Sequence, residues 1–135
     1  MQPATSYAMK AVCNLPFDDA VSKAREELAK EGFGVLTEID VKATLKKKIN
    51  VDFRPYIILG ACNPPLAHEA LTAELDIGIL LPCNVVVHAT DDPNVSSVAA
   101  IDPAVQLGVT GRADIEPIAI RVREKLERVI SAMRR

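Results

Sequence analysis

The sequence predicts an α+β protein in which about five β-strands form one sheet backed by α-helices. Short apolar runs typical of strands alternate along the chain with segments whose apolar residues recur at helical spacing. The composition is that of a globular protein, because 49% of the residues are hydrophobic and 25% are charged. A chain of 135 residues fits a single domain, and no repeat, low-complexity segment or linker divides it. We therefore expect one domain over residues 1–135.

The N-terminal part predicts a strand followed by a helix. Residues 5–13 partly alternate between apolar and polar side chains, which indicates a strand. Asn14 and Pro16 are residue types that favour the start of a helix, and Gly32 favours its end. Apolar residues recur at helical spacing between these positions, so we expect the helix to bury one face.

A second strand and a short basic helix are expected next. Residues 33–40 predict the strand, and the Asp40 carboxylate is suited to cap the helix that follows. The spacing of Val41, Leu45 and Ile49 predicts the inner face of this helix. Its outer face, near Arg54 in the sequence, carries Lys42, Lys46, Lys47 and Lys48. Two interpretations of these lysines stay open, a solvated helical face or a patch that binds phosphate or carboxylate.

The middle of the chain contains two apolar runs, each with a cysteine followed by asparagine. Residues 56–62 form an unbroken apolar run, which is typical of a strand covered on both faces. Asn63 is then placed to cap a helix over residues 64–75, which opens on two prolines. Residues 77–87 predict the next central strand, in which Pro82 indicates a bulge or an edge.

The C-terminal part predicts a hairpin and a long helix. Residues 91–94 have turn composition, and residues 95–101 predict a last strand that pairs with the preceding one. After an irregular connection, a helix is expected to begin at Asp114 with Pro117 in its first turn. A continuous apolar stripe predicts the buried face of this helix: Ile115, Ile118, Ala119, Val122, Leu126, Val129, Ile130 and Met133.

Cys62 is the main candidate for chemistry. It ends a predicted strand immediately before an asparagine-capped helix, so its sulfur would lie near the positive end of the helix dipole, which lowers the pKa of a thiol. A packing role is an equal alternative, because cysteine is among the most buried residue types. Cys83 would belong to the same site if its strand neighbours that of Cys62, and it otherwise packs in the core. Cys13 is expected to be structural.

Three further residues of this region are candidates for ligand binding. Asn63 and Asn84 follow the two cysteines, although capping alone explains the presence of Asn63. His68 lies in the predicted helix after Asn63 and is either part of a site or an exposed side chain. Two thiols and an imidazole suit a soft metal, but no Cys-x-x-Cys or His-x-x-x-His spacing occurs, so we predict no metal site. The sequence indicates no particular cofactor.

Charge and composition exclude several classes of partner. A net charge of −2 gives no electrostatic basis for binding nucleic acid, and five aromatic residues are few for stacking on bases. No apolar run is long enough to span a bilayer, and the first residues lack the pattern of a signal peptide. Three cysteines without paired spacing do not resemble a secreted disulfide framework. We therefore expect a cytoplasmic protein that binds neither nucleic acid nor membranes.

Segments distributed over essentially the whole chain resemble the family called Domain of Unknown Function 302. They are residues 32–46, 53–56, 59–67 with Cys-Asn-Pro-Pro, and 81–86 with Pro-Cys-Asn. The resemblance implies a compact α+β fold with a mixed sheet backed by helices, and a homodimer. It also implies an association of some members with sulfur metabolism, but no established activity and no catalytic residue. Cys13 lies outside the family pattern, in agreement with a structural role.

The preferred hypothesis is a homodimeric module that presents a cysteine site to a small ligand. In this hypothesis Cys62 and Asn63, with Cys83 as a possible second thiol, bind a sulfur species or another small molecule. The basic residues Lys42, Lys46 and Arg54 are expected to lie nearby.

Two alternatives come from other classes of protein. In the first, the chain is a thiol-dependent enzyme in which Cys62 is the nucleophile and His68 or Glu69 moves protons. In the second, Cys62 and Cys83 are both core residues, and the protein acts through its dimer surface as an assembly or regulatory partner.

Overall fold

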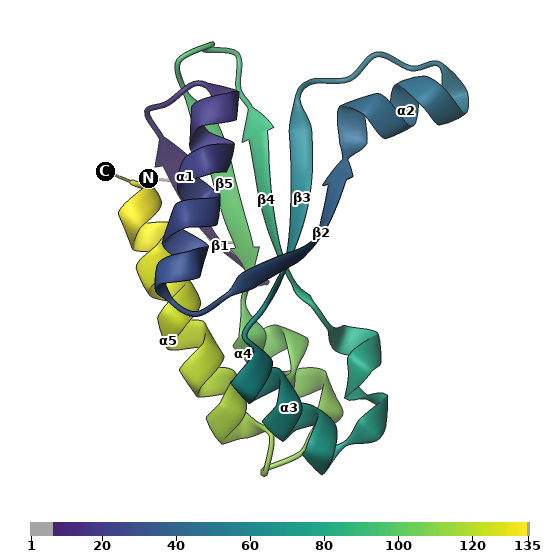
Figure 1. Ribbon diagram of the computed structural model, residues 1–135, viewed down its shortest axis with the longest axis vertical. Coiled ribbons are helices and arrows are strands. Elements are labelled where there is room, and N and C mark those ends of the chain that lie inside the picture. Colours follow the sequence, from purple (N-terminus) through teal and green to yellow (C-terminus); the bar gives the residue numbers. More distant parts are fainter. Residues whose placement is uncertain (1–6, 135) are drawn as a thin grey trace.

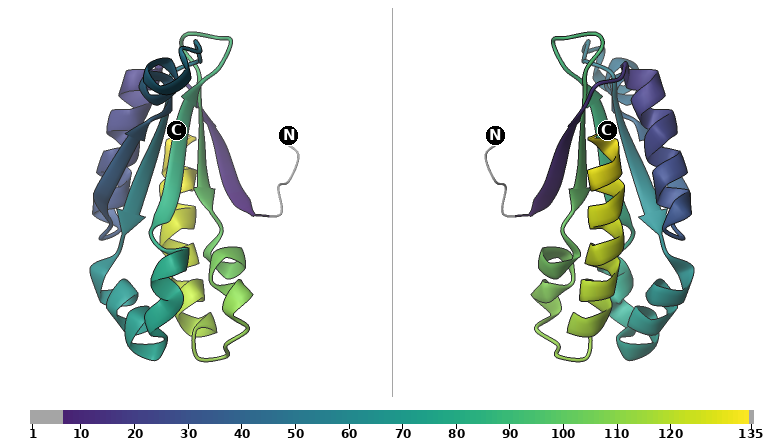
Figure 2. Two further views of the ribbon diagram at one scale, coloured as in Figure 1. Left: turned by 90° about the vertical axis from the view of Figure 1, so that its right-hand side faces the viewer. Right: turned by 90° about the vertical axis from the view of Figure 1, so that its left-hand side faces the viewer.

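The computed structural model describes residues 7–134, which form a five-stranded sheet with its long helices on one face (Figure 1, Figure 2). The strands are β1 (Ala8–Cys13), β2 (Gly34–Asp40), β3 (Tyr56–Cys62), β4 (Cys83–Ala89) and β5 (Ser96–Ile101). The helices are α1 (Phe17–Lys30), α2 (Val41–Ile49), α3 (Pro64–Ala73), α4 (Pro103–Gln106) and α5 (Glu116–Met133). Two short 3₁₀ helices are η1 (Leu75–Leu80) and η2 (Gly108–Thr110).

The sheet has the strand order β1-β5-β4-β3-β2, and every neighbouring pair is antiparallel. The predicted α+β class with five strands is confirmed, whereas the expected mixed sheet is wrong. Strands β2 to β5 are neighbours in chain order, so each connection between them reverses the direction of the chain. Helix α1 carries the chain from β1 at one edge to β2 at the other, which leaves no parallel pair.

The first helix differs slightly from the expectation at both ends. Its N-cap is Pro16 rather than Asn14, and no side chain accepts a hydrogen bond there. Its last helical residue is Lys30, and Gly32 follows with a φ of +82°, a conformation that glycine adopts without strain. Of the expected first strand, residues 5 and 6 lie outside the described residues.

Helix α5 covers the sheet with the apolar stripe that the sequence predicts. All eight residues of that stripe are buried, and the helix packs against α1, β1 and β5. The helix begins at Glu116 instead of Asp114, and Pro117 lies in its first turn as expected. Among helices within residues 7–134, none combines the length and apolar character needed to cross a membrane.

Helices cover strand β3 on one face only, which corrects the expectation of two covered faces. Ile57, Leu59 and Ala61 are buried towards α1 and α5, while Ile58 on the other face is half-buried. Figure 2 shows no helix over that second face. The apolar run was continuous because the uncovered face is itself rich in apolar side chains.

The predicted strand over residues 77–87 is wrong in its first half. The segment up to Leu80 is the 3₁₀ helix η1, the Leu81–Pro82 peptide bond is cis, and β4 begins only at Cys83. Proline has no N–H for the strand ladder, so Pro82 precedes the strand instead of interrupting it. The hairpin between β4 and β5 is confirmed, with Val87 opposite Val98.

Helix α2 projects beyond the sheet and buries no residue (Figure 1). The predicted cap is confirmed, because the Ala43 N–H donates to the Asp40 carboxylate at 2.9 Å. The predicted inner face is wrong: Val41 and Leu45 are only half-buried, and Ile49 is 63% exposed. Periodicity identified the helix correctly, but within the described residues its apolar side is only partly covered.

A bulge in β2 depends on Gly60 in the neighbouring strand. Val35 lies opposite Ala61 and Thr37 lies opposite Gly60, so Leu36 is an extra residue without a partner in β3. A Cβ atom added to Gly60 would overlap the Thr37 Oγ1 atom and would lie 2.9 Å from Cγ of Pro82. The missing side chain therefore allows Thr37 and Pro82 to pack across β3.

We predict that Gly60→Ala lowers the free energy of unfolding by about 1–3 kcal/mol, because the new methyl group overpacks this contact. Urea denaturation measures the change. Gly34→Ala is the matched control, since no atom lies within 4 Å of a Cβ at that position of β2. Equal stability of the two variants would contradict the close packing over Gly60.

Candidate functional site

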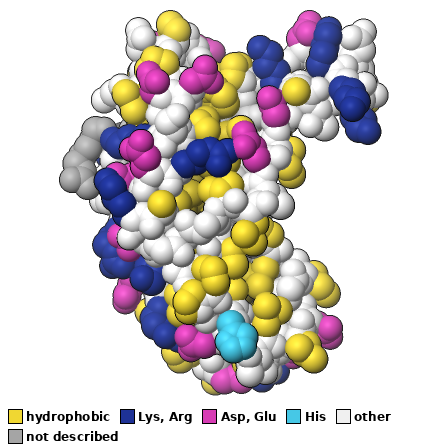
Figure 3. All heavy atoms as spheres, in the orientation of Figure 1, with side chains coloured by type: hydrophobic (Ala, Val, Ile, Leu, Met, Phe, Trp, Pro, Cys, Tyr) yellow, Lys and Arg dark blue, Asp and Glu magenta, His cyan; other side chains and the backbone are white. Residues whose placement is uncertain are grey.

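A cavity of about 330 Å³ lies at the end of the sheet where β3 finishes and β4 begins. We call it the apolar pocket. Its walls come from β2, β3, α3, η1, β4 and α5 and from residues beside these elements. They include the apolar residues Phe33, Leu36, Leu66, Ala67, Leu107, Ile118 and Val122, and the amide of Asn63. None of the side chains that line it within residues 7–134 is charged. Figure 3 shows hydrophobic side chains gathered at this end of the molecule.

Cys62 and Cys83 both line the apolar pocket, so the structure brings together the two cysteines of the predicted site. Their strands are neighbours, but the register places Ala61, not Cys62, opposite Cys83. Side chains alternate between the faces of a sheet, so the two thiols leave their strands on opposite faces. Both thiols are free.

Burial favours the neutral form of both thiols of the pocket. It raises the pKa of Cys83 from 9.0 to about 11, against the lowering effect of a hydrogen bond to Gln106 and with a small further rise from nearby Cys62. Burial also raises the pKa of Cys62, the opposite direction to that expected from the helix dipole. The N–H of Leu66 at the start of α3 is bonded to Asn63 at 3.4 Å, and burial is the dominant influence on the sulfur.

Asn63 has a structural role that uses both ends of its amide. Its Oδ1 atom accepts the N–H of Leu66 and caps α3, as the sequence predicts. Its Nδ2 atom donates to the carbonyl oxygen of Glu31 at 3.3 Å. The amide therefore joins the end of α1 to the beginning of α3 beside the pocket.

Gln106 is a residue of this region that sequence reasoning missed. Its Oε1 atom accepts a hydrogen bond from the Cys83 thiol at 3.4 Å, and its Nε2 atom donates to the carbonyl oxygens of Leu80 and Pro82. Gln106 lies in α4, within a segment that was expected to be irregular. Asp102 followed by proline was the available signal, because the Asp102 carboxylate caps α4 at 2.9 Å.

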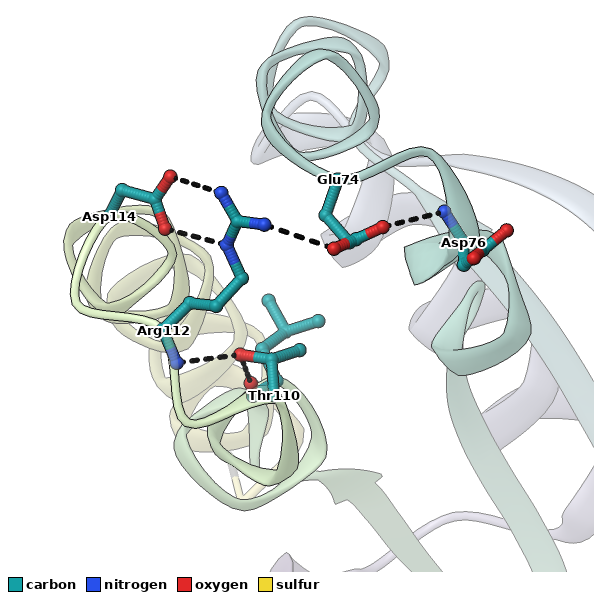
Figure 4. A network of polar contacts seen from close by, with 6 residues as sticks. Glu74, Asp76, Thr110, Arg112 and Asp114 are labelled. Carbon is teal, nitrogen blue, oxygen red and sulfur yellow. Dashed lines mark hydrogen bonds and ion pairs between the residues drawn. The ribbon is translucent and has the colours of Figure 1, made fainter.

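A polar network on the surface joins two segments that flank the pocket (Figure 4). The Arg112 guanidinium binds both oxygens of Asp114, at 2.9 and 2.7 Å, and reaches Glu74 at 3.0 Å. The other Glu74 oxygen accepts the N–H of Asp76 at the start of η1. Hydrogen bonding from Arg112 lowers the pKa of Asp114. The network ties η1 to the loop that precedes α5.

Other predicted site residues near α3 and β4 lie outside the pocket. His68 is exposed on α3, next to Glu69, whose carboxylate pairs with Arg121 at 2.6 Å. Asn84 is exposed and lies opposite Gly60, on the face of the sheet away from Cys83. Cys13 is buried in the core, as expected. Within the described part of the chain, no group of three or more His, Cys, Asp or Glu residues is arranged to hold a metal ion.

The basic residues lie at the other end of the sheet, which corrects the expectation that they adjoin the cysteines. Lys42 and Lys46 are on α2, and Arg54 precedes the beginning of β3, whereas Cys62 ends that strand (Figure 1, Figure 3). The seven residues of β3 separate the two ends by roughly 20 Å. Lys46 pairs with Asp52 at 3.1 Å, and Arg54 donates to the carbonyl oxygen of Ala89 at 3.2 Å.

The antiparallel sheet, its helices on one face and the pocket at its end define a two-layer α+β protein with a thiol-containing cavity. The chain belongs to the family described as the domain of unknown function DUF302, whose model matches residues 9–133. It is similar to the crystal structure of an uncharacterized conserved DUF302 protein from Bacillus stearothermophilus, with 26% identity and a TM-score of 0.87. That likeness covers 96% of this chain and all of the other. No curated protein matches the chain.

We predict that Cys62 and Cys83 react slowly with iodoacetamide at neutral pH, because the thiolate is the reactive form and burial disfavours it. The rates should rise above pH 9, and for Cys83 they should continue to rise towards pH 11. Mass spectrometry of the separate peptides measures both rates, and the chain unfolded in urea is the control. Fast modification of Cys62 at pH 7 in the folded protein would show that the thiol is ionised.

Proposed function

We propose that the protein binds a small, uncharged, apolar molecule in the apolar pocket. The observation that carries this proposal is the pocket itself, about 330 Å³ in volume, lined by apolar side chains, two thiols and the amide of Asn63. Pockets for small molecules have volumes of roughly 300–1,000 Å³ and mainly apolar walls. The volume lies at the small end of this range, so the ligand is smaller than a nucleotide cofactor.

The raised pKa values of the two thiols favour ligand binding in the pocket over nucleophilic catalysis. Both thiols have raised pKa values, so little thiolate is present at neutral pH. The proposed proton carriers of the enzyme alternative, His68 and Glu69, are not among the residues that line the pocket. Neutral sulfur atoms offer soft, polarizable contacts to an apolar guest.

A sulfur species, if it is the ligand, binds as a neutral molecule in this proposal. An anion would lose its hydration without gaining a cationic partner, because no positively charged side chain of the described residues lines the pocket. Reduced thiols at Cys62 and Cys83 agree with a cytoplasmic location, which forms part of the proposal.

The uncovered face of the sheet supports a second part of the proposal, a homodimer. Side chains on this face include Val12, Ile39, Ile58 and Val86, and Lys10 is its only cationic residue in the described strands. A two-fold interface places the same surface on both partners. A face with many apolar and few charged side chains can therefore meet its own copy without strong repulsion.

We predict that Ala67→Phe weakens binding of the uncharged dye Nile red at least tenfold, because the new ring occupies the pocket that Ala67 lines. A fluorescence titration measures the affinity. Ala43→Phe is the control, since it adds the same ring to an exposed position of α2. Equal binding by the two variants, or no binding by the unmodified protein, would refute the proposed function.

We also predict that Ile39→Lys lowers the oligomeric mass to that of one chain, because the dimer would hold two unpaired cations in its interface. Light scattering during size-exclusion chromatography measures the mass. Ile120→Lys is the matched control, because Ile120 on α5 is 47% exposed and Ile39 is 46% exposed. A single-chain mass for the unmodified protein would contradict the homodimer without affecting the pocket.

A further inference from the structure

Leu36 occupies an unusual place at the apolar pocket. It is the extra residue of the β2 bulge, so it has no partner in β3. It lines the pocket and is nevertheless 66% exposed to solvent. The other leucines, isoleucines, valines and phenylalanines that line the pocket within residues 7–134 are buried or half-buried. Leu36 is thus the large apolar side chain of the wall that remains mostly in water.

The backbone that presents Leu36 is fixed by its neighbours. Thr37, the next residue, packs across Gly60 of β3 together with the ring of Pro82, which itself lines the pocket. Val35, the preceding residue, is paired with Ala61, another lining residue. β-Bulges commonly redirect a side chain next to a functional site. The bulge therefore directs Leu36 to the pocket, and the packing over Gly60 holds it there.

We infer that Leu36 covers the outer part of the bound molecule and sets the length of apolar ligand that the pocket accepts. This inference rests on the proposed function. The ligand class that follows is an uncharged molecule with a hydrocarbon portion that extends from the inner wall, at Leu66 and Val122, outward to Leu36. Such a ligand removes apolar surface of Leu36 from water, whereas a shorter one leaves that side chain exposed.

The test compares n-alkanols of increasing length, which carry one small polar group at the end of an apolar chain. Each alcohol displaces Nile red from the protein, and the competition gives its affinity. For Leu36→Ala we expect roughly tenfold weaker binding of the longest alcohols that the unmodified protein accepts, because the lost methyl and methylene groups no longer contact them. The shortest alcohols should bind both proteins within about twofold of each other, since they do not reach residue 36.

Leu75→Ala is the matched control. Leu75 on η1 is 82% exposed, and it is not among the residues that line the pocket. This variant removes the same groups from the surface near the pocket, and we expect it to bind every alcohol like the unmodified protein. Circular dichroism confirms that both variants are folded, which their exposed positions favour.

The outcomes separate this inference from the proposed function. If the unmodified protein binds Nile red, Ala67→Phe abolishes binding, and Leu36→Ala changes all alcohols equally or none, then the role of Leu36 is wrong and the pocket function stands. If Ala67→Phe and the unmodified protein bind the dye and the alcohols equally, both ideas fail. Selective weakening of the longer alcohols in Leu36→Ala, and not in Leu75→Ala, supports the inference.

Discussion

The length of α5 relative to the strands is the constraint on which the arrangement of this protein depends. Its 18 residues extend about 27 Å, whereas strands of six or seven residues extend roughly 20–23 Å. The C-terminal part of the helix covers the sheet, and its N-terminal part extends beyond the strand ends (Figure 1). Apolar residues on that extension, such as Ile118 and Val122, must bury their side chains against something other than strands. Helix α3, η1 and the segment that follows α4 gather there, and residues of all three line the apolar pocket.

The backbone N–H and C=O groups of the irregular segments around the pocket need hydrogen-bond partners. The side-chain amides of Asn63 and Gln106 bond to several of these groups. Asn63 joins the ends of α1 and α3, and Gln106 bonds to the carbonyl oxygens on both sides of Leu81. A buried carbonyl oxygen without a partner costs about 1–3 kcal/mol, so these amides allow the chain to leave regular structure near the pocket. The Arg112 network has a similar effect on the solvent side.

The sequence was most informative where the structure is determined locally. The caps at Asp40 and Asn63, the stripe of α5 and the β4–β5 hairpin were predicted from neighbouring residues. The sequence was least informative where tertiary packing determines which face of an element is buried. An apolar run cannot state which of its faces a helix will cover, so β3 was expected to be buried on both sides. The apolar side of α2 is likewise only partly covered within the described chain.

The candidate site was predicted only in part, for the same reason. The two Cys-Asn pairs directed attention to the end of the sheet where the apolar pocket lies. The relation between Cys62 and Cys83 depends on strand register, which places Ala61 opposite Cys83. The contribution of Gln106 depends on a helix of four residues, too short to show a period. The pKa of each thiol depends on how deeply it is buried, which cannot be read from the sequence. The position of the α2 lysines depends on the direction of β3, which begins near α2 and ends at Cys62.

The lack of buried residues in α2 has a consequence for how this chain can vary. Unwinding α2 exposes no core side chain, so the connection from β2 to β3 behaves energetically as a long surface loop. We expect insertions or deletions there to leave the sheet register and the distant pocket intact. We therefore expect this arm to accept segments of other lengths and charges, and a reporter attached there to leave the pocket unchanged.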